Sequence, residues 1–202
     1  MKFAYLLIGS ILVVSLSTSC KDDAKNKEET TTTEEAVNSE EKEAEEEEYL
    51  EQVIANSVLA KLMVTPEAKA YAQKTLNASL TDMLSKDAGP FTLLVPSNEA
   101  FGNLPEAKKT ELARVDQLEA LGTLLKNHMV AGEFSTATLT QTVKRNGTHT
   151  LKTIGGADLM VYLEGTNIMV KDKNGVAATI GKSDIMADNG IVHIIDSVLV
   201  ID

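Results

Sequence analysis

The stretch GPFTLLVPSNEAF, residues 89–101, passes from a turn through an apolar segment into a polar cluster. The apolar residues 91–95 predict a buried strand that stops at Pro96, and some hydrolases hold their nucleophilic serine directly after such a strand. That arrangement requires glycines on both sides of the serine, whereas Ser97 is flanked by Pro96 and Asn98. We therefore predict that Ser97 caps a following helix by accepting a hydrogen bond from a free backbone N–H.

The first half of the chain has the periodicity of helices. Apolar residues recur at helical spacing over 50–63 and predict one helix there. A second helix is predicted over 65–84 and is stopped by the Gly-Pro pair that opens the stretch quoted above. A third is predicted over 116–129, because Asp116 and Glu119 have the spacing of a capping box.

The second half has the composition of short strands. Segments rich in Val, Ile, Leu and Thr are separated by turn sequences that contain glycine. These segments are HTLKTI, LMVYL, NIMVK, VAATI and IVHIIDSVLVI. Helices followed by hairpins predict an α+β fold, with a mainly antiparallel sheet arrangement and helices packed on it. Continuous apolar runs indicate that some strands are covered on both faces.

Three stretches together resemble the fasciclin domain. They are GPFTLLVPSNEAFGNLP (89–105), LLKNHMVAGEFSTATL (124–139) and SDIMADNGIVHIIDSVLV (183–200), and they occur in the order and at the spacing of the family. The resemblance implies a wedge-shaped β-sandwich with a helical layer packed on it. It also implies a module for adhesion or interaction with an extracellular matrix.

The central stretch departs from the family at one position. Where animal matrix members have a Tyr-His pair implicated in receptor binding, this chain has Asn127 followed by His128. The resemblance makes Asn127 and His128 candidate partner-binding residues, although the aromatic residue of the pair is missing. His128 also lies beside the apolar face of its helix, where a packed, hydrogen-bonded structural role is the main expectation.

The N-terminal end predicts export and lipidation. Residues 1–19 have the basic start and short apolar core of a signal peptide. The stretch LSTSC, residues 16–20, resembles the lipobox of bacterial lipoproteins and implies that Cys20 carries diacylglycerol; a plain secretory signal is the alternative. The acidic residues after Cys20 resemble signals that send lipoproteins of Bacteroidota-type bacteria to the cell surface. We therefore expect a protein anchored in a bacterial outer membrane, with exposure on the cell surface as a further possibility.

Residues 20–48 predict a tether, and 49–202 predict the fasciclin domain. The tether contains 13 acidic and 4 basic residues, a net charge of −9, and almost no large apolar side chain. Such a segment is expected to stay disordered because it cannot bury enough apolar surface. Residues 49–202 have a net charge of −3 and no basic cluster that would indicate nucleic-acid binding. We expect a monomer.

The remaining polar residues predict neither a metal site nor a catalytic site. Three histidines without a close pairing do not form a zinc motif, and His193 is expected to share one strand face with Ile191 and Ile195. The acidic stretch 184–196 lacks the ligand spacing of a calcium loop. Asp184 is instead expected to cap or orient a loop, and the DNG sequence to form a tight turn.

The sequence therefore favours a binding function. We expect a lipid-anchored module that recognises a protein or polysaccharide partner outside the cell. No acid–base pair or nucleophile has supporting residues, so we expect neither an enzyme nor a bound cofactor. The alternative is a small-ligand carrier with an apolar pocket in the same fold.

Overall fold

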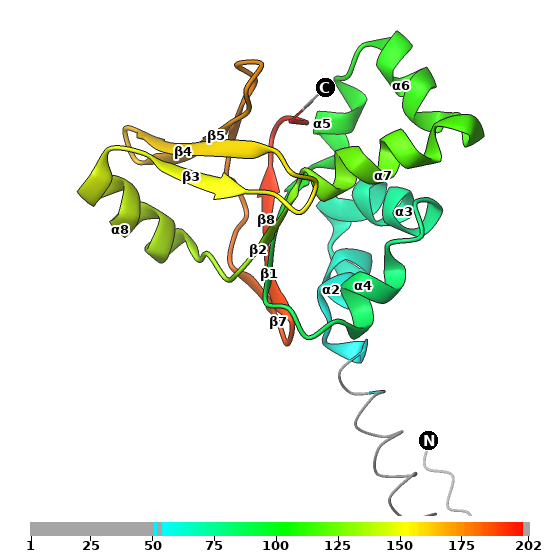
Figure 1. The fold of residues 1–202 in the computed structure, drawn as a ribbon, viewed down its shortest axis with the longest axis horizontal. Helices are drawn as coiled ribbons and strands as arrows, with labels where there is room; N and C mark the ends of the chain where they lie inside the picture. The colour runs from blue at the N-terminus through cyan, green and yellow to red at the C-terminus, as the bar shows by residue number, and fades with distance from the viewer. Residues whose placement is uncertain (1–50, 52–53, 200–202) are drawn as a thin grey trace, which may run out of the picture. The chain divides into compact units, whose positions relative to one another are not determined.

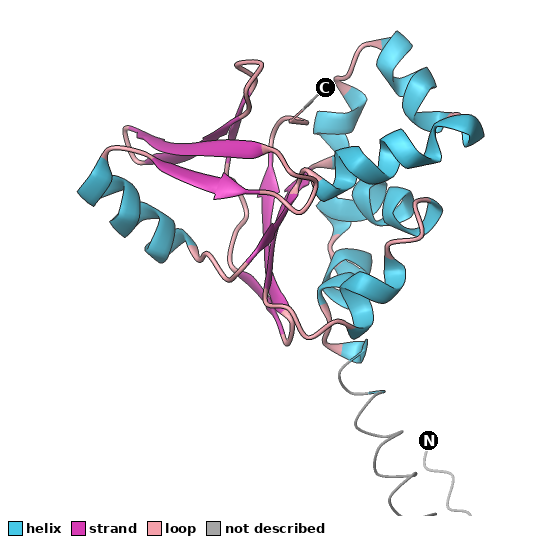
Figure 2. Cartoon of the chain, viewed as in Figure 1, coloured by secondary structure: helices cyan, strands magenta, loops and turns pink. Residues whose placement is uncertain are grey.

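The structure is a computed structural model that describes residue 51 and residues 54–199. These residues belong to one compact unit. The signal peptide, Cys20 and the whole acidic tether lie outside the described residues. Two four-stranded sheets and a group of helices make up the fold, as Figures 1 and 2 show.

The helices form two groups, one beside each sheet. Most of them pack together on one side, and α8 lies apart from them against the second sheet (Figure 1). Their bounds are α2 Val58–Val64, α3 Lys69–Asn77, α4 Thr81–Lys86, α5 Asn98–Gly102, α6 Glu106–Ala113, α7 Leu118–Lys126 and α8 Thr136–Asn146. Two short 3-10 helices, η1 Pro66–Ala68 and η2 Val115–Gln117, precede α3 and α7.

The first sheet has the order β2-β1-β8-β7 and is built around a parallel pair. Its strands are β1 Phe91–Pro96, β2 Met129–Ala131, β7 Ile185–Ala187 and β8 Gly190–Ile195. Strands β1 and β8 run parallel, in a register from Phe91 opposite Gly190 to Pro96 opposite Ile195. The outer strands β2 and β7 pair with them in the antiparallel sense.

The second sheet is antiparallel throughout and has the order β3-β4-β5-β6. Its strands are β3 His149–Lys152, β4 Asp158–Glu164, β5 Asn167–Lys171 and β6 Ala177–Thr179. All five predicted strand segments contribute strands, and β4 and β8 begin one residue before their predicted segments. Together the two sheets and the helices confirm the α+β fold with helices packed on the sheets.

The central strands of the first sheet separate two apolar cores. Along β1, Leu93 and Val95 face the helices, whereas Leu94 faces the second sheet. Strand β8 alternates in the same way, with Ile194 toward the helices and Ile195 toward the second sheet. This two-sided burial explains why the strand segments are continuously apolar rather than alternating.

Three helical predictions were wrong in their details. The helix predicted over 50–63 is interrupted, because the hydroxyl of Ser57 accepts from the N–H of Ala60 and starts α2. The helix predicted over 65–84 is split into α3 and α4 by Ser79, which has a positive φ of 56°. In the third, Asp116 pairs with Arg114 and does not cap α7.

That third helix also ends earlier than predicted. It ends at Lys126, and Met129 begins β2. The apolar residues of a helix face and of a short edge strand are continuous in the sequence at this point, so periodicity could not separate them.

Ser97 has the capping role that the sequence predicted. Its hydroxyl accepts from the N–H of Ala100 at 3.0 Å, and Ser97 precedes the first residue of α5. The N–H of Ser97 donates to the carbonyl of Ile195, which ties the end of β1 to β8. The serine that follows the buried strand is therefore a structural residue.

The side chain of Asn189 joins two helices to the first sheet. Asn189 lies in the tight turn between β7 and β8 and is buried. Its Oδ1 accepts from the N–H of Val58 at 2.8 Å, at the start of α2. Its Nδ2 donates to the carbonyls of Leu84 at 3.1 Å and Asp87 at 3.0 Å, at the end of α4.

We predict that Asn189→Ala lowers the free energy of unfolding by about 3 kcal/mol, because it removes three hydrogen bonds and leaves buried backbone groups without partners. Urea unfolding followed by circular dichroism measures the loss. The exposed Asn146→Ala serves as the matched control and should change stability by less than about 0.5 kcal/mol. Equal stability of the two variants would contradict the role assigned to Asn189.

Candidate functional site

The two candidate partner-binding residues lie in the interior. The side chain of Asn127 is 3% exposed and that of His128 is 1% exposed, at the junction of α7 and β2. Direct contact of these side chains with a partner would require the domain to open locally. Their partner-binding role stays a prediction, and any such role would act through the segments that they hold.

His128 fixes the C-terminal segment to α7. Its Nδ1 lies 2.9 Å from the carbonyl oxygen of Leu124, and its Nε2 lies 3.1 Å from the backbone nitrogen of Leu199. Because the N–H of Leu199 must donate to Nε2, the proton of the neutral ring is on Nδ1 and is donated to Leu124. Burial lowers the pKa of His128 to about 4, so the ring is neutral at physiological pH. This confirms the structural role expected for His128.

Asn127 shapes the loop that follows β3. Its Oδ1 accepts from the hydroxyl of Thr153 at 3.3 Å. Gly155 packs so closely that a Cβ at this position would lie 2.0 Å from the same oxygen. Asparagine therefore fills a space between α7 and this loop, and glycine at 155 is a steric requirement.

His193 and Asp184 connect the first sheet to the start of α8. His193 accepts at Nδ1 from the N–H of Asp184 and donates from Nε2 to the carbonyl of Phe134 at 2.8 Å. Asp184 accepts from both the N–H and the hydroxyl of Thr136, the first residue of α8. The expected roles of both residues are confirmed: His193 is buried within its strand, and Asp184 orients a loop and a helix terminus.

Burial and hydrogen bonding shift the pKa values of this pair. Burial lowers the pKa of His193, against the opposing effect of the carbonyl of Phe134 and the charge of Asp184. Burial raises the pKa of Asp184, but the hydrogen bonds from Thr136 outweigh it, so the net pKa is lowered. A neutral imidazole beside an ionised carboxylate is a structural arrangement here, because His193 bonds to two backbone groups and Asp184 to the N–H and hydroxyl of Thr136.

Metal ligands do not gather in the part of the chain that the structure describes. No group of three His, Cys, Asp or Glu side chains there is placed to hold an ion. Asp196, one of the acidic residues considered for calcium, accepts from the N–H of Thr179 and so joins β8 to β6.

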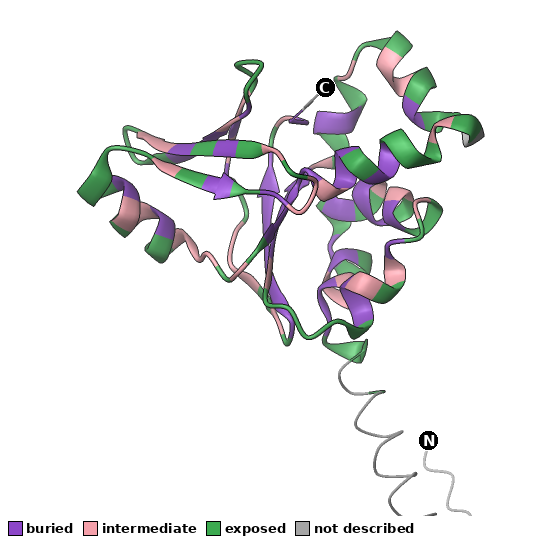
Figure 3. Cartoon of the chain, in the orientation of Figure 1, coloured by how far each residue is buried: buried purple, intermediate pink, exposed green. Residues whose placement is uncertain are grey.

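One face of the second sheet is open along β3 and β4. Helix α8 covers the opposite face through Leu139 and Val143, and Figure 3 shows exposed and buried positions alternating along β3 and β4. Thr150, Met160 and Lys171 are neighbours on adjacent strands, and their side chains point away from α8. Tyr162 lies two residues after Met160 on β4 and points the same way. We call these four residues the open sheet face. The side chain of Met160 is 43% exposed.

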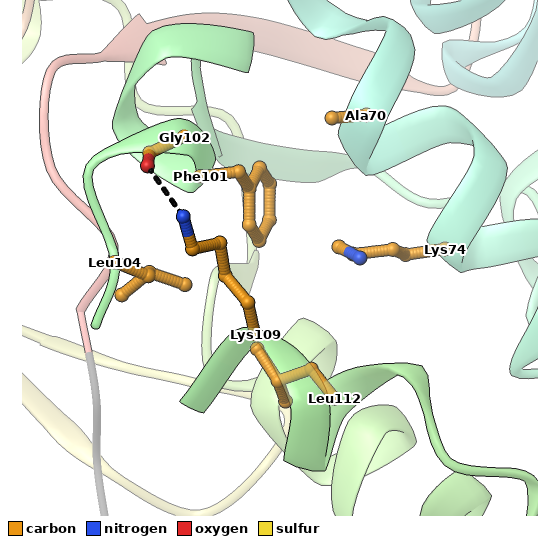
Figure 4. Close-up of a pocket in the computed structure, with 7 residues that line it drawn as sticks. All are labelled: Ala70, Lys74, Phe101, Gly102, Leu104, Lys109 and Leu112. Atoms are coloured by element: carbon orange, nitrogen blue, oxygen red, sulfur yellow. Dashed lines mark hydrogen bonds between the residues drawn. The ribbon is translucent and has the colours of Figure 1, made fainter. Parts of the chain in front are cut away.

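A second feature is a cavity of about 250 Å³ among the helices. It lies between α3, α5 and α6, and Figure 4 shows its lining residues: Ala70, Lys74, Phe101, Gly102, Leu104, Lys109 and Leu112. The sequence predicted an apolar pocket in this fold only as an alternative. Its position among three helices was missed, because Phe101, Lys74 and Lys109 are brought together by packing rather than by spacing.

The geometry of the cavity is fixed by polar contacts between its walls. Asn98, the first residue of α5, accepts from the N–H of Ala70 at 2.8 Å and donates to the carbonyl of Pro66 at 2.7 Å. Lys109 of α6 donates to the carbonyl of Gly102 at 3.1 Å, at the end of α5. The three helices that line the cavity are thus tied to one another.

Comparison with known proteins identifies related sequences and folds. The model of the fasciclin domain family matches residues 66–201. The chain is similar to the uncharacterised protein sll1735 of Synechocystis sp., with 36% identity over 60% of this chain and 80% of that protein. It is also similar to the transforming growth factor-beta-induced protein ig-h3 of Sus scrofa, with 30% identity over 62% of this chain but 16% of that protein.

A solved structure has the same fold. A FAS1 domain pair from the insect cell adhesion molecule fasciclin I aligns with a TM-score of 0.64 and 22% identity, over 72% of this chain and 51% of that one.

Within the described residues, no helix is long and apolar enough to cross a membrane.

We predict that acidification destabilises the domain through its buried histidines. The unfolded chain binds a proton at His128 below about pH 6.5, whereas the folded chain binds it only near pH 4, so the free energy of unfolding falls as the pH falls between these values. His128 contributes a loss on the order of 3 kcal/mol across this interval, and His193 adds to it in the same direction. Urea unfolding at several pH values within the interval measures the slope.

The matched variant is His128→Gln, which does not titrate. It is expected to be less stable than the wild-type protein at neutral pH but to lose less stability on acidification. An unchanged pH slope in this variant would show that His128 does not titrate as its burial requires.

Proposed function

The chain belongs to the fasciclin domain family, and from that premise we propose that it is a lipid-anchored adhesion module, which recognises a protein or polysaccharide partner outside a bacterial cell. In this proposal Cys20 carries the lipid, the acidic segment 20–48 is the tether, and the anchor lies in the outer membrane. The domain acts as a monomer and by binding rather than by catalysis.

The observation that carries the proposal is the use of the polar side chains in the fold. Ser97 caps a helix, and His128, His193 and Asp184 each bind backbone groups of neighbouring segments. In the described part of the chain these four residues are thereby held in structural hydrogen bonds, and none of them lines the cavity among α3, α5 and α6. A surface that recognises another molecule is the function best suited to this arrangement.

We place the partner-binding surface on the open sheet face. Methionine and tyrosine are enriched in protein interfaces, and Met160 and Tyr162 lie on the same face of β4, with Thr150 and Lys171 supplying polar groups beside Met160. This composition favours a protein partner over a polysaccharide. It also agrees with the adhesion context of fasciclin I, whose domain pair shares the fold.

Asn127 and His128 would contribute to this function indirectly. Asn127 holds the loop between β3 and β4, and the open sheet face lies on the strands that this loop connects. A change at Asn127 is therefore expected to act on binding through the position of β3 and β4 and not through contact with the partner.

We predict that cells displaying the protein attach to matrix-coated or cell-coated surfaces more strongly than cells lacking it. The double variant Met160→Asp with Tyr162→Ala should reduce this attachment by about tenfold or more, because it removes the apolar centre of the surface. Met186→Asp is the matched control, because Met186 is 54% exposed on the other sheet. Attached cells are counted at equal display levels, and thermal unfolding verifies that all variants are folded.

Two results would contradict this proposal. Equal attachment of displaying and non-displaying cells would refute adhesion, and equal loss in the double variant and the Met186 control would refute the open sheet face. Protease or periodate treatment of the coated surface then identifies the partner class. Loss of attachment after protease alone is expected, and loss after periodate alone would assign a polysaccharide.

The anchor has its own test. Cys20→Ala should move the protein from the membrane fraction to the soluble fraction, because the thiol that would carry the lipid is absent. Detergent phase partition of cell extracts measures the change. Lys21→Ala, next to the cysteine, is the control and should leave the protein in the detergent phase. An unchanged partition of the Cys20 variant would refute lipid anchoring.

A further inference from the structure

The cavity among α3, α5 and α6 combines an apolar lining with a cationic edge. Phe101 and Leu112 are buried side chains in its walls, and Leu104 packs against the same core. Two lysines, Lys74 from α3 and Lys109 from α6, complete the lining, and Figure 4 shows the ring of Phe101 between them. Such a cavity offers an apolar molecule contact on several sides and offers an anionic group a partner at the edge.

The two lysines differ in how their charges are compensated. Lys109 pairs with Glu106 at 2.5 Å and donates to the carbonyl of Gly102. Lys74 lies over the ring of Phe101, with its Nζ 5.2 Å from the ring centroid. Among the described residues, no carboxylate lies within ion-pair distance of Lys74. The positive charge of Lys74 is therefore stabilised by the aromatic face of Phe101 and by no carboxylate of the described residues.

We propose that this cavity binds a small organic monocarboxylate with an alkyl or aryl body. The carboxylate pairs with the ammonium group of Lys74, which is half-buried and so less screened by solvent than a fully exposed lysine. The apolar body lies against Phe101, Leu104 and Leu112. The methylene groups of Lys109 supply a further apolar wall, because the ammonium end of this side chain is turned toward Gly102 (Figure 4).

The volume limits the size of the ligand. At the packing density of protein interiors, about 0.74, a cavity of about 250 Å³ holds a molecule with a van der Waals volume of roughly 185 Å³. This volume suits a carboxylate the size of octanoate or phenylpropionate and is too small for a long-chain lipid. The walls are tied together by Asn98 and Lys109, so the site is formed before the ligand arrives.

The proposal is tested by nuclear magnetic resonance titration of the mature chain, residues 20–202, with Cys20→Ala so that no acyl chain of its own can compete. Octanoate should cause saturable shifts of the backbone amides of Ala70, Lys74, Gly102 and Leu112. Octanol, which has the same body without the charge, should bind at least about tenfold more weakly, the loss expected for one charge-assisted hydrogen bond.

Two variants separate the two parts of the site. Lys74→Met should weaken octanoate binding by about tenfold but leave octanol binding unchanged, because it removes the charge and keeps an apolar chain. Ala70→Leu should abolish binding of both compounds by filling the cavity. The matched controls are Lys144→Met on α8 and Ala120→Leu on α7, both exposed and outside the cavity lining, and they should bind like the wild-type protein.

Three results would overturn the proposal. These are the absence of saturable shifts with octanoate up to about 10 mM, equal affinities for octanoate and octanol, and an unchanged octanoate affinity in Lys74→Met. The adhesion proposal is tested independently of the ligand proposal, because the open sheet face lies on the second sheet and the cavity lies among the helices. Lys74→Met is accordingly expected to attach like the wild-type protein in the cell assay.

Discussion

The carboxamide of Asn189 is the contact on which the helical side of the domain depends. One side chain accepts from the start of α2 and donates to the end of α4, while its own backbone carbonyl accepts from Phe91 at the start of β1. An amide is needed because the site presents one donor and two acceptors, a set that neither a carboxylate nor an apolar side chain can satisfy. The turn between β7 and β8 thus fixes helices that come more than a hundred residues earlier.

The buried histidines follow the same principle. His128 and His193 each accept from one backbone group and donate to another, which sets a single tautomer for each ring. Imidazole is suited to joining an N–H and a carbonyl that lie far apart in the sequence. Ser97, His128 and His193 of the family segments therefore hold parts of the fold together, whereas the residues of the open sheet face lie outside those segments.

Sequence reasoning predicted those parts of the structure that depend on local chemistry. The Ser97 cap, the strand segments and the family were predictable, because each is encoded within a few neighbouring residues. The contacts of Asn189 could not be predicted, since its partners at Val58 and Leu84 are close only after folding. The cavity could not be predicted either, because Lys74 and Phe101 lie on separate helices and become neighbours only when these helices pack together.

The parallel pairing of β1 with β8 has a consequence for the order in which the domain can form. Strand β1 begins at Phe91, and its partner strand begins ninety-nine residues later at Gly190, so the centre of the first sheet closes a very long loop. Such pairings slow folding, because the entropy of closure is lost before the contacts are gained. During synthesis or passage through a membrane, neither core can be completed until residues 190–195 have emerged, and the domain therefore folds only once almost its entire chain is available.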